Sequence, residues 1–372
     1  MLYPKADFVG LGTTIHLAAG GETPMLASHR DAIEEFMSDK SAGMPGRERF
    51  FAKRLVCAQR VARMLNVDSG DIAFVGSSSA GIASIVSAYT WRPGDEVITV
   101  DDEYPSGRYL FGWLQRFGVV PVMPAFHADP EIEAQAIIDA ITSRTRLIYL
   151  SQVSTRTGRR IPMQGIADAA HAVGAQVLVD ATHSLGIIAV DASDIDFVVC
   201  SGYKWLFGTH LGIVMWNRHR VPTFEPMVGW RSATPAPHPA AYHTHADAAR
   251  IEVGNPNFVD LYILANALAY HQSVDSATLE RYVLDQGERL YAAFETAGVE
   301  LLTPRNAAHR AGNICAVSAD PAAVVHDARR EGIELWGDVD LQRIRCSVHG
   351  YVTPQDVDYA CAVLPKLVAR YP

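Results

Sequence analysis

Seven short apolar runs, separated by longer polar or amphipathic stretches, constrain the fold of this chain more than any other feature. Several of them are continuous β-branched or aromatic runs rather than alternations, which is typical of strands that are covered on both faces. Amphipathic stretches such as 47–65 and 163–174 predict helices, and Gly174 is a normal residue to end the second one. This order of strands and helices predicts an α/β fold with a mostly parallel seven-stranded sheet flanked by helices. The predicted strands are 71–77, 96–102, 119–125, 146–153, 176–181, 196–202 and 212–217.

The composition changes at 221–250, where Pro, Ala and His dominate. Such a stretch predicts a long surface loop or a crossing between domains. A helical run at 258–298 follows, with shorter strand and helix patterns after it. Since 372 residues are enough for two domains, we expect a large domain at 16–255. A smaller α/β domain would then be formed by 1–15 and 256–372.

Charge and composition exclude several classes of protein. The formal net charge of -9 argues against a nucleic-acid partner, which would require clustered surplus Lys and Arg. No apolar run reaches the roughly 18 residues of a membrane-spanning helix, and the first residues lack the pattern of a signal peptide. The cysteines have neither the spacing of a disulfide framework nor that of a zinc site. We therefore expect a cytoplasmic protein with reduced thiols, without a metal and without a membrane partner. The cysteines are Cys57, Cys200, Cys315, Cys346 and Cys361.

Polar clusters follow the carboxyl ends of the predicted strands, where ligands bind in sheets of this kind. The clearest of them combines Asp180 and His183 in DATHS with Ser201 and Lys204 in SGYK. A lone lysine after a buried strand could simply extend into solvent at the edge of the sheet. However, an amine that forms an imine and a carboxylate that keeps a ring nitrogen protonated are what a pyridine cofactor requires.

The pairing of DATH with SGYK resembles the class V aminotransferase family of fold-type I pyridoxal-phosphate enzymes, and the likeness covers roughly residues 15–365. That superfamily includes cysteine desulfurases, selenocysteine lyases, isopenicillin N epimerase-like proteins and kynureninase. The resemblance implies pyridoxal phosphate as cofactor, with Lys204 as its Schiff-base lysine. It also implies that Asp180 pairs with the ring nitrogen and that His183 contacts the phenolic oxygen. Ser201 and Tyr203 fall where the family has Ser and His against the phosphate, so Tyr203 is a departure.

Further cofactor contacts follow from the same resemblance. In GSSSAG (76–81), Ser78 and Ser79 fall where the family binds the phosphate of the cofactor. Small residues at a helix N-terminus suit an anion, although a plain helix cap has the same pattern. Tyr104 in DDEYPSG takes the position of a stacking histidine, and Thr155 that of an asparagine near the ring. Asn255 in GNPN replaces a threonine that reaches the partner subunit's phosphate in the family's dimers; the alternative is an ordinary Asn-Pro turn.

For the substrate, the resemblance assigns Arg345 in RIRCSV to the carboxylate, which a planar guanidinium can hold through both oxygens. Trp230 is a candidate for the substrate pocket, although a tryptophan at a domain crossing is as often structural. Gln152 is a weaker candidate, and Arg156 fits either the pocket or the surface.

We therefore expect a homodimer with shared active sites that acts at the α-carbon of an amino acid, with Lys204, Asp180, His183 and Tyr104 as catalytic residues. A lyase or epimerase is the favoured reaction class, an aminotransferase is the alternative, and a non-catalytic cofactor-binding protein is a more distant one. A nucleotide-binding oxidoreductase is disfavoured because the chain lacks G-x-G-x-x-G.

A cysteine desulfurase is not expected, because residues 331–344 before Arg345 contain no cysteine. In a strand, Cys346 would point away from the face that carries Arg345. Cys200 is expected to be a packed core thiol.

Overall fold

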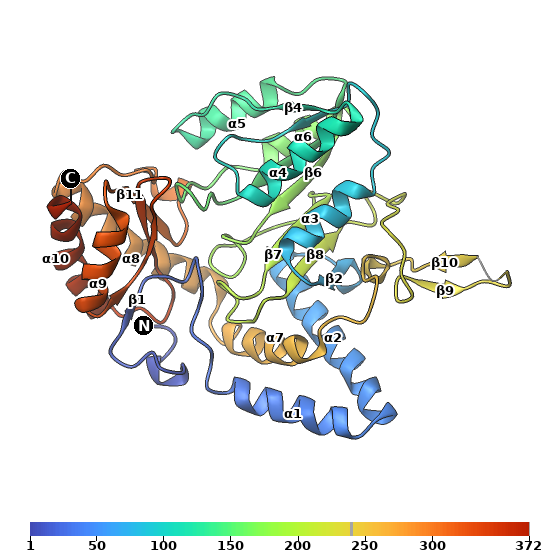
Figure 1. The fold of residues 1–372 in the computed structure, drawn as a ribbon, viewed down its shortest axis with the longest axis horizontal. Helices are drawn as coiled ribbons and strands as arrows, with labels where there is room; N and C mark the ends of the chain where they lie inside the picture. The colour runs from blue at the N-terminus through green and yellow to red at the C-terminus, as the bar shows by residue number, and fades with distance from the viewer. Residues whose placement is uncertain (239–240, 372) are drawn as a thin grey trace.

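The computed structural model describes residues 1–238 and 241–371, and its centre is a seven-stranded sheet (Figure 1). All seven predicted strands are present, and each pairs parallel to its neighbours except β8, which runs antiparallel to both β2 and β7. The predicted mostly parallel α/β sheet is therefore confirmed. In spatial order the strands are β2 (Ile72–Val75), β8 (Gly212–Trp216), β7 (Phe197–Ser201), β6 (Gln176–Asp180), β5 (Thr145–Ser151), β3 (Glu96–Ile98) and β4 (Val120–Val122).

Both faces of this sheet are buried, which explains why its strands are continuously apolar. Along β5, Leu147 and Tyr149 pack with α3 (Ser78–Ser87) and α4 (Pro105–Leu114). The intervening Ile148 and Leu150 point into the core on the other face. Successive side chains of a strand point to opposite faces, so one run of apolar residues supplies both cores. Helices α2 (Met44–Leu65), α5 (Pro130–Asp139) and α6 (Gln164–Ala172) contribute to the second core.

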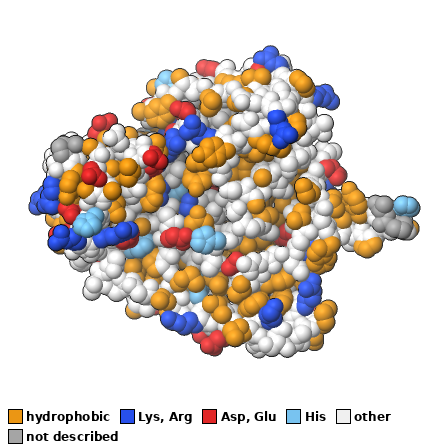
Figure 2. All heavy atoms as spheres, viewed as in Figure 1, with side chains coloured by type: hydrophobic (Ala, Val, Ile, Leu, Met, Phe, Trp, Pro, Cys, Tyr) orange, Lys and Arg blue, Asp and Glu red, His pale blue; other side chains and the backbone are white. Residues whose placement is uncertain are grey.

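The segment 221–250 is not simply a loop, which corrects one expectation. It contains an antiparallel hairpin of β9 (Ala233–Pro235) and β10 (Tyr242–Thr244), followed by the 3-10 helix η4 (Ala248–Ile251). The hairpin projects from the body of the molecule (Figures 1 and 2). Strands of three residues are too short to show an alternating apolar pattern, so they could not be predicted from the sequence.

The last part of the chain builds a second, smaller sheet of β11 (Asn313–Val317), β14 (Arg343–Ser347) and β13 (Trp336–Asp338). Helices α8 (Ser276–Thr296), α9 (Pro321–Arg330) and α10 (Pro354–Arg370) pack beside it, and β1 (Ile15–His16) pairs with β12 (Ile333–Glu334). The helix α7 (Phe258–His271), by contrast, packs on α1 (His29–Ser41) and α2 of the larger unit. The domain boundaries themselves stay a prediction. The remaining short helices are η1 (Lys5–Asp7), η2 (Ser69–Asp71), η3 (Gln115–Phe117) and η5 (Ala307–His309).

The described residues offer neither a membrane span nor a cluster of metal ligands. None of their helices is both long and apolar enough to cross a membrane. Nor do the described residues contain a group of three or more His, Cys, Asp or Glu side chains that could hold a metal ion.

Candidate active site

A cavity of about 160 Å³ lies at the carboxyl ends of β5, β6 and β7. The polar clusters that follow these strands meet there, as the topology of a parallel sheet requires. Nine of the side chains that the sequence assigned to the cofactor line this one cavity. They are Ser78, Ser79, Tyr104, Thr155, Asp180, His183, Ser201, Tyr203 and Lys204.

Lys204 lies in the turn after β7, and its side chain is buried. Its Nζ lies 3.3 Å from Nε2 of His183 and 5.8 Å from the ring centroid of Tyr104. Burial, more than the neighbouring charge of Arg345, lowers the pKa of the Lys204 amine from its ordinary 10.5 to about 8. An appreciable fraction of this amine is therefore uncharged and nucleophilic near neutral pH.

The hydrogen bonds of His183 determine which of its ring nitrogens carries the proton. Burial lowers the pKa of this imidazole well below its usual value, so the ring is neutral. The amide oxygen of Asn313 accepts a hydrogen bond from Oγ of Ser347 at 2.7 Å, so its Nδ2 donates to Nδ1 of His183 at 3.0 Å. Because Nδ1 accepts, the ring proton resides on Nε2, where the uncharged form of the Lys204 amine can accept it. The cavity thus contains a fixed N–H donor.

Asp180 is the last residue of β6 and forms the floor of the cavity. It accepts a hydrogen bond from the backbone N–H of Thr182 at 2.8 Å and a long one from the hydroxyl of Tyr149 at 3.5 Å. Burial raises the pKa of this carboxyl, and no cationic group of the described residues lies within ion-pair distance of it. A buried carboxylate without a cation is costly, so the position suits a ligand with a protonated ring nitrogen.

The N-terminus of α3 faces the opposite end of the cavity. Ser77 caps the helix by accepting from the N–H of Ala80 at 3.1 Å. The hydroxyl of Ser78 bonds to that of Ser201 at 2.8 Å. Hydroxyl groups and the positive end of a helix dipole together suit a phosphate. Tyr203 stacks on His210 with ring centroids 4.3 Å apart, and burial raises the pKa of its phenol to about 12, so it also remains a donor.

A second cavity, of about 450 Å³, adjoins the first and shares Tyr104, Thr155, Tyr203 and Lys204 with it. Arg345 reaches this cavity from β14 of the small sheet. Its Nη1 donates to Oγ1 of Thr155 at 2.6 Å and to the carbonyl oxygen of that residue at 3.1 Å. Burial lowers the pKa of the guanidinium to about 10, so it remains charged at neutral pH. The arrangement places a guanidinium, which can bind a carboxylate, in a cavity that Lys204 also lines.

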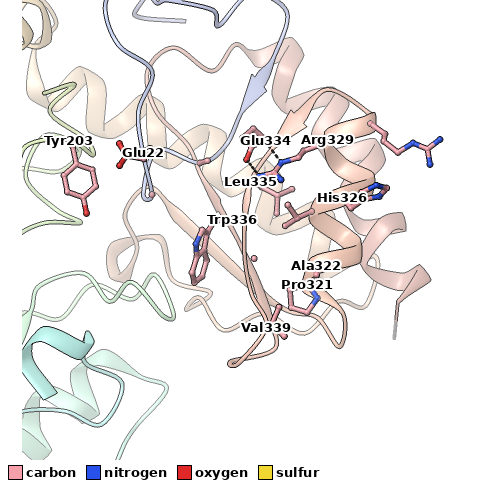
Figure 3. A pocket seen from close by; sticks show the side chains of 15 residues that line it. Glu22, Tyr203, Pro321, Ala322, His326, Arg329, Glu334, Leu335, Trp336 and Val339 are labelled. Atoms are coloured by element: carbon pink, nitrogen blue, oxygen red, sulfur yellow. Dashed lines mark hydrogen bonds and ion pairs between the residues drawn. The ribbon is translucent and has the colours of Figure 1, made fainter. Parts of the chain in front are cut away.

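A wider groove of about 830 Å³ continues from the second cavity, and Tyr203 and Trp336 line both (Figure 3). Trp336 lies between the large unit and the side chains of α9 in this view. It pairs directly across from Arg345 in the small sheet, and the guanidinium lies 4.6 Å from the indole centroid.

Two of the predicted site residues line neither cavity. Asn255 is exposed and accepts a hydrogen bond from Nη2 of Arg47 at 3.2 Å. Trp230 has 63% of its surface exposed and lies 5.9 Å from the same guanidinium. Within a single chain, neither residue makes the contact that the sequence assigned to it. The amide oxygen of Gln152, the weaker candidate, is buried without a partner but also lies outside both cavities.

The sequence missed Asn313 and Trp336, which sit on strands of the small sheet and carry no local motif. It also left Arg156 undecided, and the structure places this residue in the lining of the second cavity. A signal existed only for Trp336, a large aromatic residue that lies shortly before Arg345 in the sequence.

The fold and the site together define a pyridoxal-phosphate-dependent enzyme of fold type I. The described residues fit that cofactor: an amine, a carboxylate without a cation, a fixed N–H donor and a helix N-terminus surround one cavity. The profile of the Aminotransferase class-V family matches residues 47–359, and the chain belongs to this family.

Similar proteins differ in the reactions they catalyse. Isopenicillin N epimerase of Streptomyces clavuligerus is 24% identical over 84% of this chain and 84% of its own length. A probable cysteine desulfurase of Methanothermobacter thermautotrophicus is 23% identical over 98% and 97%, respectively. Among solved structures, a complex of the cystine C-S lyase C-DES with cysteine persulfide has a TM-score of 0.86 at 22% identity, covering 96% of this chain and 99% of that one. The family profile establishes the family and the solved structure the fold, while the reaction of this chain must be argued from its own residues.

Proposed function

We propose that this enzyme removes the α-proton of an amino acid and eliminates a substituent from its β-carbon. The observation that carries the proposal is the position of Lys204, an amine with a pKa of about 8 that lines both cavities, next to the carboxylate-binding Arg345. Among the described residues that line these cavities, Lys204 is the only lysine. Elimination requires a single base, whereas epimerisation requires a proton donor on each face of the substrate.

The residues of the first cavity would hold the cofactor, which when bound withdraws electrons from the substrate's α-carbon. Asp180 would pair with the protonated ring nitrogen, and Nε2–H of His183 would donate to the ring oxygen. Ser78, Ser79, Ser201 and Tyr203 would bind the phosphate at the N-terminus of α3. Tyr104 would stack on the ring, since an aromatic side chain can do so without a charge.

The residues around the second cavity orient the substrate for proton removal. Arg345 holds both carboxylate oxygens, and its own position is fixed by Thr155 and Trp336. Lys204 then takes the α-proton while the β-substituent leaves with the electron pair of its bond and acquires a proton. The organic product, 2-aminoacrylate, is hydrolysed by water to pyruvate and ammonia, so the net reaction consumes one water for each leaving group released.

The cysteines argue against a desulfurase that stores sulfur as a protein-bound persulfide. None of the five cysteines lines either cavity. Cys200 and Cys346 are buried in the apolar core, and burial raises the pKa of both thiols. The turn between β13 and β14 has only four residues, 339–342, and contains no cysteine. A nucleophilic thiolate needs a lowered pKa and access to the substrate, and these thiols have neither.

Epimerisation is the second candidate, and Tyr104 is the observation that favours it. Its ring lies 5.8 Å from the Lys204 amine, and its hydroxyl group is a proton donor. If the substrate lies between the two groups, a proton removed by Lys204 could be replaced from the face of Tyr104. The Tyr104→Phe variant should then still exchange the α-proton with solvent through Lys204 and lose inversion.

A homodimer with shared sites is part of the same proposal. Asn255 lines a separate cavity of about 840 Å³ that shares His210 and Leu211 with the cofactor cavity. Nearby Met227 and Trp230 are 74% and 63% exposed, which is unusual for large apolar side chains outside an interface. A second copy seated here would place its own Asn255 close to the phosphate-binding residues. Light scattering should give a dimer, and Asn255→Ala should weaken cofactor retention.

The test of the reaction is a product analysis in deuterium oxide with S-substituted cysteines and a panel of other amino acids. Stoichiometric pyruvate and ammonia support elimination, whereas deuterium at an inverted α-carbon without pyruvate supports epimerisation. Amino-group transfer to an added keto acid would instead identify an aminotransferase, and the absence of any product would identify a binding protein. A persulfide on Cys200 or Cys346 after incubation with cysteine would overturn the argument against a desulfurase.

A further inference from the structure

The second cavity contains more positive charge than binding one carboxylate requires. Three arginines line it, namely Arg156, Arg343 and Arg345. Arg345 is assigned to the α-carboxylate, and Nη2 of Arg343 is paired with Asp338 at 3.1 Å. The guanidinium of Arg156 forms neither an ion pair nor a hydrogen bond with the other described residues. One cation of the cavity is therefore available to a ligand.

The backbone around Arg156 is fixed, so this cation is part of a built site. The N–H groups of Arg156 and Thr157 both donate to Oγ of Ser154, at 3.1 and 3.3 Å. Ser154 in turn donates to Asp102 at 2.9 Å, and the buried Arg159 binds the same carboxylate at 2.7 Å. The preceding residue, Thr155, accepts the hydrogen bonds of Arg345. Arg156 is thus fixed in position next to the residue that orients the α-carboxylate site.

Buried donors without acceptors are a second sign that the cavity binds anions. The Nε atoms of Arg343 and Arg345 are buried and have no hydrogen-bond partner, and each side chain is 3% exposed. Unsatisfied buried donors are costly and are usually explained by a ligand or an ion. Asp338 and Asp340 also line the cavity, but Asp338 already pairs with Arg343. The lining therefore has an excess of donors and of positive charge.

The neighbouring groove is less suited to a negative charge. In Figure 3, Arg329 binds Glu334 through two hydrogen bonds, at 2.7 and 2.8 Å, so its charge is already balanced. The other arginine of the groove, Arg330, is exposed to solvent, where an ion pair contributes little. Trp336 lines both the groove and the second cavity, and its ring lies 4.6 Å from Arg345 and 5.4 Å from Arg343. A negatively charged end of a substrate would find its unbalanced counter-charge at Arg156.

We propose that Arg156 binds a second carboxylate, one carried by the β-substituent of the substrate. The preferred substrates are then β-substituted amino acids whose side chain ends in a carboxylate. This inference rests on the proposed elimination for its kinetic test, whereas its binding test does not depend on the reaction.

The experiment compares S-carboxymethylcysteine with S-carbamoylmethylcysteine, which has the same shape and lacks the charge. The holoenzyme should show a kcat/KM about tenfold or more higher for the acid, as expected for a charge-assisted hydrogen bond. Arg156→Gln should bring the ratio of the two kcat/KM values close to one. The matched control is Arg330→Gln, an exposed arginine of the neighbouring groove, which should keep the wild-type ratio.

Equal kcat/KM values for the two compounds in the wild type would overturn the inference while leaving the elimination intact. Loss of the preference in Arg330→Gln but not in Arg156→Gln would also overturn it and would assign the anion to the groove. If neither compound releases pyruvate, the proposed elimination fails. Calorimetric affinities of the two compounds then decide the inference: tighter binding of the acid that disappears in Arg156→Gln supports it, and equal binding refutes it.

Discussion

The hydrogen bonds of Asn313 should decide whether His183 presents a donor or an acceptor to the cofactor cavity. Nδ2 of Asn313 donates to Nδ1 of His183 at 3.0 Å, and Oδ1 accepts from Ser347 at 2.7 Å. All three side chains are buried. In Asn313→Asp, a carboxylate replaces the amide donor and requires a proton on Nδ1. We therefore expect Nε2 to lose its proton, or the imidazole to become charged, and the cavity to lose its fixed neutral donor.

The magnitude follows from the same contacts. Asn313→Ala should lower the free energy of unfolding by roughly 2–4 kcal/mol, since an unpaired buried polar group costs about 1–3 kcal/mol and the cavity left behind adds to this. The control Ser347→Ala removes one neutral hydrogen bond and should cost about 1 kcal/mol. It also removes the hydrogen bond that fixes the amide orientation of Asn313, so the tautomer of His183 should be less uniform than in the wild type.

The assay is a nitrogen NMR spectrum of the cofactor-free enzyme labelled at histidine, with His183→Gln to assign the signal. The wild type should show the proton on Nε2, Ser347→Ala a mixture of the two tautomers, and Asn313→Asp a proton on Nδ1 or on both nitrogens. Urea unfolding of the same variants gives the stability differences. A wild-type proton on Nδ1, or a tautomer unaffected by Asn313→Asp, would refute the reasoning.

Three further predictions concern reactivity, substrate binding and pH. In the cofactor-free enzyme, acylation of Lys204 by an amine-directed reagent should increase as the pH rises through about 8, not 10.5. In the cofactor-loaded enzyme, borohydride should fix the cofactor to this residue and to no other lysine. Arg345→Lys retains the charge and loses the bidentate geometry, so KM should rise about tenfold or more with an unchanged cofactor spectrum; unaltered kinetics would remove Arg345 from the site. Burial lowers the pKa of His16 and His29 to about 4 and that of His349 to about 3. Below pH 6.5 these histidines bind protons in the unfolded chain but not in the folded one, so the free energy of unfolding should fall as the pH is lowered from 6.5 to 4. The fall should be less steep in His29→Gln, and urea unfolding midpoints measure both.

The strands and the cofactor-binding loops are encoded locally. Each strand of the large sheet is a short apolar run buried on both faces, so its pattern does not depend on which strand lies beside it. The residues that meet at the cofactor cavity follow consecutive strands, and a parallel sheet brings the carboxyl ends of its strands to one edge. Asp180 and Lys204 could therefore be placed together from the sequence before their distance was known.

Only the tertiary structure decided what comes from elsewhere in the chain. Asn313 reaches His183 and Arg345 reaches Thr155 because the small sheet docks against the large one, and that docking depends on shape and packing without a periodic signal. The hairpin of β9 and β10 is also invisible in the sequence, since its strands are too short to establish a pattern. Only the tertiary structure shows that Arg343 is paired with a carboxylate of the protein and that Arg156 is not. This difference matters because the affinity of a guanidinium for a ligand depends on which carboxylates of the protein already bind it.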